Sequence, residues 1–122
     1  ITMGEPEVAS LHPLRGTSER DLIAAAAALE ARSSHPLARA ILARADRDGI
    51  VAKAAEETRT VPGRGVEGVH AGRTIWLGSN RFAAEKKLGA AMPRDVVDRI
   101  EGAGSTLVAV GDDAALLGLI EL

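Results

Sequence analysis

The sequence contains no cysteine and no tyrosine, and its only phenylalanine or tryptophan residues are Phe82 and Trp76. Without cysteine it can form no disulfide, no thiolate-ligated zinc site and no cysteine nucleophile. It also lacks a stripe of lysine or arginine, and its net charge over 122 residues is −2. Nucleic-acid-binding proteins need such side chains to stack on bases and to neutralise phosphates. We therefore expect no nucleic-acid partner.

Long hydrophobic runs are also absent. The longest apolar run, residues 22–29, is much shorter than the roughly 20 residues that cross a bilayer. Residues 1–11 do not resemble a signal peptide, because Glu5 and Glu7 interrupt them and no basic segment precedes them. A chain of this length can bury about two thirds of the surface that its unfolded form exposes. We expect one soluble domain over residues 1–122, without direct membrane contact.

Hydrophobic periodicity alternates between that of strands and that of helices, with glycine and proline at the joints. The expected strands are residues 6–14, 57–61, 66–71, 74–78, 105–110 and 114–121. The expected helices are residues 20–31, 34–48, 79–87 and 93–101. The resulting order predicts an α/β (α+β) fold, in which a sheet of about six mainly antiparallel strands is flanked by two helical hairpins.

Local signals support several of these boundaries. Ser18, three residues before Asp21, is a typical cap for the first helix. Ser34 is the candidate cap of the second helix, and Pro36 suits its first turn. Gly111-Asp112-Asp113 indicates the turn of a β-hairpin between the last two strands.

Gly63, Gly65 and Gly68 form a GxGxxG pattern. In dinucleotide-binding units this pattern opens a helix, whereas here strand-like residues 66–71 follow it, so we expect no such unit. Glycine lacks Cβ, and the pair flanking residue 64 allows a ligand or another backbone to approach the main chain closely. The alternative is a purely structural turn with positive φ angles.

Glu30 and His35 are the second candidate feature. A histidine at a helix N-terminus lies at the positive end of the dipole, which disfavours the imidazolium; a neutral ring can both donate and accept. Glu30 lies near the C-terminal end of the preceding helix, where a carboxylate is placed unfavourably. Each residue alone is most simply a solvated surface residue. Together with the glycine turn they form a candidate purine site, with a carboxylate to accept from an exocyclic amine.

Other chemistry is scarce in the sequence. The three histidines lack the spacing of a metal site and have no cysteine companions, so we expect no metal-binding residues. Ser34 and His35 are no catalytic pair, because adjacent residues at a helix start do not face each other. We expect no catalytic residue within the chain.

Three motifs follow one another along the chain, namely LEARSSHPLARAI at 29–41, PGRGVEG at 62–68 and WLGSNR at 76–81. In this order they resemble the nucleotide-binding (N) domain of heavy-metal-transporting P-type ATPases. Residues 1–8 are similar to the stretch after the phosphorylated-aspartate motif DKTGT, and residues 118–122 to the strand that returns to the phosphorylation domain. The resemblance covers essentially the whole chain. It implies a single ATP-binding domain inserted between the two halves of a phosphorylation domain.

By this resemblance, the chain binds the adenosine part of ATP for a metal pump that phosphorylates an aspartate outside the chain. ATP and ADP are the implied ligands, and Mg²⁺ comes mainly from the phosphorylation domain. The implied partners are the phosphorylation and actuator domains of the same parent chain. The implied location is the cytoplasmic face of a bacterial plasma membrane. The isolated domain is expected to be monomeric and to bind ATP without turning it over.

The resemblance also assigns the site. It places at the adenosine the residues Glu30, His35, Gly63, Gly65, Val66 and Gly78. Copper pumps have adjacent Gly and Asn at the end of this set, whereas this chain reads Gly78-Ser79-Asn80, so either Ser79 or Asn80 takes that place. The Gly-Ser pair is more similar to the zinc/cadmium/lead group. Arg64 is the cation nearest in sequence for the phosphates.

Two other functions remain open from the sequence. One is a stand-alone adenine-nucleotide-sensing regulatory domain, and the other is a structural interaction domain in which the glycines and His-Pro form only a turn and a cap. A nucleotide-induced change at His35 and residues 63–65 would exclude the structural alternative.

Overall fold

The computed structural model describes residues 5–14, 16–51 and 53–122. Its elements are β1 (Ser10–Pro13), α1 (Glu19–Glu30), α2 (Pro36–Arg47), β2 (Glu56–Val61), β3 (Gly65–His70), β4 (Arg73–Gly78), α3 (Asn80–Glu85), the 3₁₀ turn η1 (Gly89–Ala91), α4 (Arg94–Gly102), β5 (Leu107–Asp112) and β6 (Leu116–Glu121). The predicted order of strands and helices, and with it the fold class, is confirmed. Within the described residues, no helix has the length and apolar character needed to cross a membrane.

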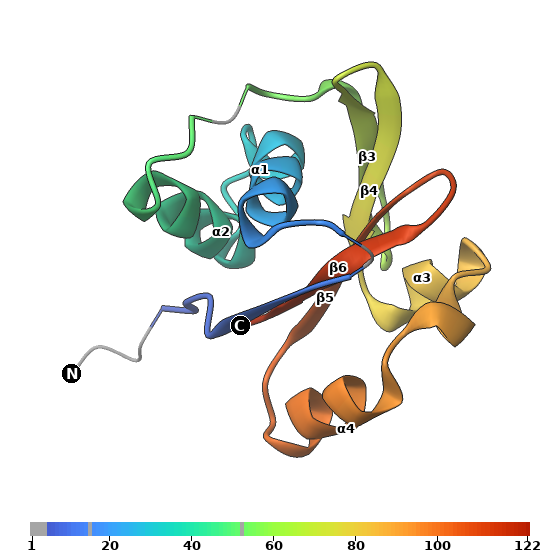
Figure 1. Ribbon diagram of the computed structural model, residues 1–122. Helices are drawn as coiled ribbons and strands as arrows, with labels where there is room; N and C mark the ends of the chain where they lie inside the picture. The colour runs from blue at the N-terminus through green and yellow to red at the C-terminus, as the bar shows by residue number, and fades with distance from the viewer. Residues whose placement is uncertain (1–4, 15, 52) are drawn as a thin grey trace.

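All six strands belong to one sheet in the order β1-β6-β5-β4-β3-β2 (Figure 1). Each neighbouring pair is antiparallel, as predicted. The first and last strands of the chain lie side by side, with Ser10 opposite Glu121. The N–H of Ala9 donates to the carbonyl of Glu121 at 2.7 Å. The described chain therefore enters and leaves the sheet at the same edge.

Several elements differ in length from the prediction. The first strand covers only Ser10–Pro13, where it pairs with β6; residues 1–4 of the segment that resembles the DKTGT flank lie outside the described residues. Helix α3 ends at Glu85, and Lys87 then takes a φ of 62°, which a helix cannot contain. The predicted hairpin between the last two strands is present, but its turn comes later than predicted, because Gly111 and Asp112 belong to β5. The Asp112 carboxylate accepts the N–H groups of Ala114 and Ala115 at 2.9 and 2.7 Å.

Helices cover both faces of the sheet (Figure 1). Helices α1 and α2 pack on one face, where Ile23 and Ile41 join Ile75 in a buried cluster. Helices α3 and α4 pack on the other, where Phe82 and Val97 join Trp76. Successive residues of a strand point to opposite faces, so β4 supplies both clusters.

Candidate functional site

A cavity of about 510 Å³ lies between the sheet and the connection from α1 to α2. One wall is formed by the end of α1, the connecting loop and the start of α2. The other wall is formed by β2, the facing ends of β3 and β4, and the start of β5. Its apolar lining includes Leu29, Leu37, Ile41, Val66, Leu77 and Val108. A largely apolar cavity of this volume, with a few polar groups at its rim, is typical of small-molecule sites.

The structure brings most of the predicted site residues to this cavity. Those that line it are Glu30, His35, Arg64, Gly65, Val66, Gly78 and Ser79. Gly63 and Asn80 are not among the lining residues. The Asn80 side-chain amide donates to Glu101 Oε2 at 2.8 Å. Ser79 lines the cavity, and its hydroxyl caps α3 by accepting the N–H of Phe82 at 3.4 Å. The role of each of these residues toward a ligand stays a prediction.

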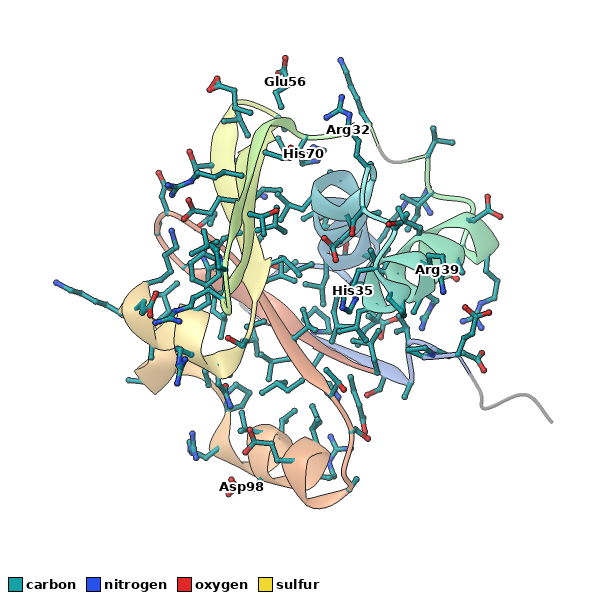
Figure 2. The ribbon with its side chains drawn as sticks, turned by 180° about the vertical axis from the view of Figure 1, so that it is seen from behind. Arg32, His35, Arg39, Glu56, His70 and Asp98 are labelled. Atoms are coloured by element: carbon teal, nitrogen blue, oxygen red, sulfur yellow. The ribbon has the colours of Figure 1, made fainter. Side chains whose placement is uncertain are left out.

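His35 caps helix α2, which corrects the prediction that Ser34 does so. Its Nδ1 accepts the N–H of Leu37 at 3.1 Å. A ring nitrogen that accepts carries no proton, so the neutral ring holds its proton on Nε2. Figure 2 shows the side chain between α2 and the sheet. His35 therefore has a structural role in the helix and still offers one N–H donor to the cavity.

Glu30 is the last residue of α1 and is half-buried at the cavity wall. Burial raises the pKa of its carboxyl. The carboxylate also lies at the negative end of the α1 dipole, which disfavours its charge. No hydrogen bond or ion pair from the described residues compensates it. A half-buried carboxylate held in this way is available to accept hydrogen bonds from a ligand.

The glycine turn is explained by contacts within the protein. Gly65 lies opposite Gly78 in the β3–β4 ladder. A Cβ on Gly65 would lie 1.9 Å from the Leu77 carbonyl oxygen, and a Cβ on Gly78 would lie 2.3 Å from that of Arg64. The sequence left open whether a ligand or another backbone approaches these glycines closely. The structure shows close approach of another backbone.

Gly63 belongs to a tight turn. The N–H of Arg64 donates to the carbonyl of Val61 at 2.9 Å, and Gly63 has a φ of 73°. Proline followed by a glycine with positive φ, inside such a hydrogen bond, is the signature of a type II turn. The structural explanation that the sequence left open thus accounts for Gly63 without a ligand.

Arg64 is the cation at the β3 end of the cavity. Its Nε donates to Glu85 Oε2 of α3 at 2.6 Å, and its side chain is 31% exposed. Among the described residues, the two terminal nitrogens of the guanidinium have no further partner and can act as donors. Arg32 lines the opposite end, where it donates to the carbonyl of Ala55 at 3.2 Å. In the described part of the chain, no group of three or more histidine and acidic side chains is arranged to hold a metal ion.

Several lining residues were not predicted from the sequence. They are Leu29, Arg32, Ser33, Leu37, Ile41, Thr58, Thr60, Leu77, Thr106, Leu107 and Val108. The apolar members are indistinguishable in sequence from core residues. Thr58 and Thr60 alternate with Arg59, so their common face was readable once the strand was assigned. The alternation does not show on which face of the sheet the cavity lies.

No protein-family model matches the chain. A zinc/cadmium/lead-transporting P-type ATPase of Escherichia coli (strain K12) is 33% identical over 123 residues, which cover the whole chain and 16% of the relative. Copper-exporting P-type ATPase B of Archaeoglobus fulgidus is 37% identical over 105 residues, 86% of this chain and 15% of the relative. A cadmium-transporting ATPase of Staphylococcus aureus is 31% identical over 98% of this chain and 17% of the relative. The chain thus spans about a sixth of the length of these curated relatives.

Solved structures agree in fold. A zinc-transporting PIB-type ATPase in the E2.Pi state superposes with a TM-score of 0.87 at 32% identity, over 98% of this chain and 19% of that chain. The N-domain of a copper-transporting P-type ATPase superposes with a TM-score of 0.78 at 25% identity, over 96% of this chain and 99% of that chain. The chain belongs to the family of heavy-metal-transporting P-type ATPases. Within that family it corresponds to the N-domain.

Proposed function

We propose that this chain binds the adenosine part of ATP in the cavity between α2 and the sheet, as the nucleotide-binding domain of a heavy-metal-transporting P-type ATPase. The observation that carries the proposal is the convergence of Glu30, His35 and the Gly65–Gly78 backbone on one cavity. These groups come from three separate motifs and meet only in the folded chain. Membership of the family supports the same ligand.

Adenine is the base that fits the polar groups. Its exocyclic amine donates to the Glu30 carboxylate, and a ring nitrogen accepts the Nε2–H of His35. Guanine presents a carbonyl oxygen where adenine has the amine, so it would place an acceptor against a carboxylate. Among the described residues, neither Phe82 nor Trp76 lines the cavity, and the base is therefore held by hydrogen bonds and aliphatic contacts. Modest affinity follows.

The phosphates extend toward Arg64, whose two terminal guanidinium nitrogens can donate to them. Phosphoryl transfer also requires positioned Mg²⁺ and an acceptor. We assign the Mg²⁺ mainly to the phosphorylation domain and the acceptor to an aspartate of that domain. The chain by itself then binds ATP and ADP without turning ATP over.

The parent protein follows from the same proposal. Entry and exit of the chain beside each other, at Ser10 and Glu121, suit a domain inserted into a phosphorylation domain. That domain and the actuator domain of the same chain are the proposed partners, at the cytoplasmic face of a bacterial plasma membrane. A zinc, cadmium or lead ion is the proposed cargo. A reading frame without DKTGT upstream would instead indicate the stand-alone nucleotide sensor.

The test is a titration of the domain with ATP, ADP, AMP and GTP, followed by amide chemical shifts. We expect saturable shifts at His35 and at residues 63–65 with the adenine nucleotides and much weaker binding of GTP. His35→Asn is the informative variant, because asparagine can replace the cap but not the imidazole N–H. It should weaken ATP binding by about 1–3 kcal/mol. An unchanged dissociation constant would contradict the site assignment.

A further inference from the structure

Strand β2 carries a bulge directly beside the cavity. Glu56 pairs with Val69 and Arg59 pairs with Glu67, so Glu57 and Thr58 together lie opposite a single residue of β3, Gly68. Glu57 has a φ of 52°, in the left-handed region that residues with a Cβ rarely adopt. Bulges often redirect side chains next to binding sites, and strained backbone persists where the surrounding structure maintains it.

The bulge determines where the next side chains point. Arg59 pairs with Glu67, which also binds Lys86 on the α3 side of the sheet. Thr58 and Thr60 flank Arg59 and therefore face the opposite side, where both line the cavity. All of β2 before Val61 is exposed. The hydroxyl groups of the two threonines are thus accessible from the cavity.

The methyl group of Thr58 is held against the sheet. A Cβ on Gly68 would lie 3.0 Å from Thr58 Cγ2 and 3.1 Å from Leu29 Cδ2. Both atoms therefore occupy the space above Gly68, which only glycine leaves free. Thr58 also lines the cavity, and its hydroxyl is the polar group that it can offer there. Leu29 directly precedes Glu30, so Thr58 lies at the Glu30 end of the cavity, whereas Arg64 follows β2 at its other end.

We propose that Thr58 is a further ligand-binding residue, whose hydroxyl hydrogen-bonds the nucleoside from the sheet side, across the cavity from Glu30 and His35. This inference rests on the proposed adenosine site. Thr58 precedes the end of β2 by three residues, or roughly 10 Å of strand. It therefore contacts the nucleoside rather than the phosphates near Arg64. The bulge at Glu57 and the missing side chain of Gly68 are the two features that aim it.

Thr58→Val tests this directly, because valine has the shape of threonine without the hydroxyl. We expect the dissociation constants of ATP and AMP to rise by the same factor, about 3- to 10-fold, as for loss of one hydrogen bond. Thr58→Ser retains the hydroxyl and should restore most of the affinity. Thr74→Val is the matched control on β4, where Thr74 is exposed and pairs with Val69 away from the cavity. It should bind both nucleotides as the wild type does.

Three results would overturn the inference. One is an unchanged affinity of Thr58→Val for both nucleotides while the wild type binds them. Another is a loss for ATP but not for AMP, which would place the hydroxyl at the phosphates. A third is a failure of Thr58→Ser to recover binding while its unfolding midpoint matches the wild type. If the wild type binds neither nucleotide, the proposed function fails as well, so the two failures are distinguishable.

Discussion

The two faces of the sheet are covered by different kinds of side chain. On the α3–α4 face both aromatic residues pack together, with the rings of Trp76 and Phe82 5.4 Å apart in an edge-to-face arrangement. Lys86 lies 5.0 Å above the Phe82 ring. On the α1–α2 face the buried residues of α1 are mainly alanine, and a cavity remains at its end. The two aromatic rings therefore stabilise the α3–α4 face, whereas the α1–α2 face is packed with alanine and aliphatic side chains.

Two glutamates show the same contrast electrostatically. On the α3–α4 face, hydrogen bonds from Lys86 and then from Arg59 lower the pKa of Glu67. On the α1–α2 face, burial raises the pKa of Glu30. A carboxylate that stabilises the fold has its charge compensated, whereas one that is left uncompensated costs stability and remains free for a ligand. The predictions below test this division between the faces, starting with the largest effect.

Gly65→Val should destabilise the domain most, by about 3 kcal/mol, because the new Cβ would overlap the Leu77 carbonyl between β3 and β4. Urea unfolding measures the change. Gly63→Ala is the control: its Cβ would meet no atom within 4 Å, so it should lose only the roughly 1–2 kcal/mol of a left-handed residue. Equal losses for the two variants would contradict the close approach of the strands.

Phe82→Leu should destabilise the domain by about 1.5 kcal/mol, since it removes the edge-to-face contact with Trp76 and the ring beneath Lys86. Its affinity for ATP should equal that of the wild type. Thermal unfolding and an ATP titration of the same sample measure both quantities. A clear change in affinity would show that the α3–α4 face takes part in ATP binding.

His35→Ala should cost about 1 kcal/mol of stability through loss of the α2 cap, in addition to its effect on nucleotide affinity. His35→Asn should retain the stability and lose the affinity. Urea unfolding of the two variants separates the roles. If they unfold at the same midpoint, the Nδ1 cap does not stabilise α2.

Glu30→Gln should stabilise the domain at neutral pH by up to about 1 kcal/mol, because it removes a charge at the negative end of α1. The folded state, with its raised pKa, binds more protons than the unfolded state between the usual and the raised value. The free energy of unfolding should therefore fall as pH rises through that interval. The variant should lack this slope and bind ATP more weakly. If the variant is less stable than the wild type, the Glu30 charge does not destabilise the domain as predicted.

Glu67→Gln should have the smallest effect, about 0.5 kcal/mol at neutral pH, because Arg59 is mostly exposed and glutamine keeps a carbonyl oxygen that can accept from Lys86. The lowered pKa of Glu67 gives a contribution that is present above the usual carboxyl pKa and lost as pH falls through the lowered one. The free energy of unfolding, measured from neutral pH to acid, should therefore change less with pH for this variant. The slope is opposite in sign to that of Glu30.

Much of the fold was predictable because its signals are local. The Ser18 side chain caps α1 by accepting the N–H of Asp21 at 2.9 Å, as expected. Short strands joined by tight turns predicted the antiparallel sheet and its last hairpin, although the turn of that hairpin follows Asp112 instead of starting at Gly111. The His35 cap was missed because histidine is an uncommon cap and Ser34 beside it is a common one.

The candidate site was only partly predictable, for a different reason. Glu30, His35 and the glycines stood out because no local rule required them all. Thr58 was missed because alternation along β2 places it on one face with Thr60 without showing that this face borders the cavity. Gly65 was noticed as a site residue, whereas its tight contact with Leu77 came from a pairing that sequence spacing cannot show.

The sequence by itself determined the elements, their antiparallel order and the three motifs, because helix caps, turns and alternating side chains act over a few residues. Only the tertiary structure decided that Trp76 and Phe82 share one face while the other face keeps a cavity. That choice depends on which side chains of distant elements meet across the sheet, and a strand's alternation defines two faces without saying which will be filled.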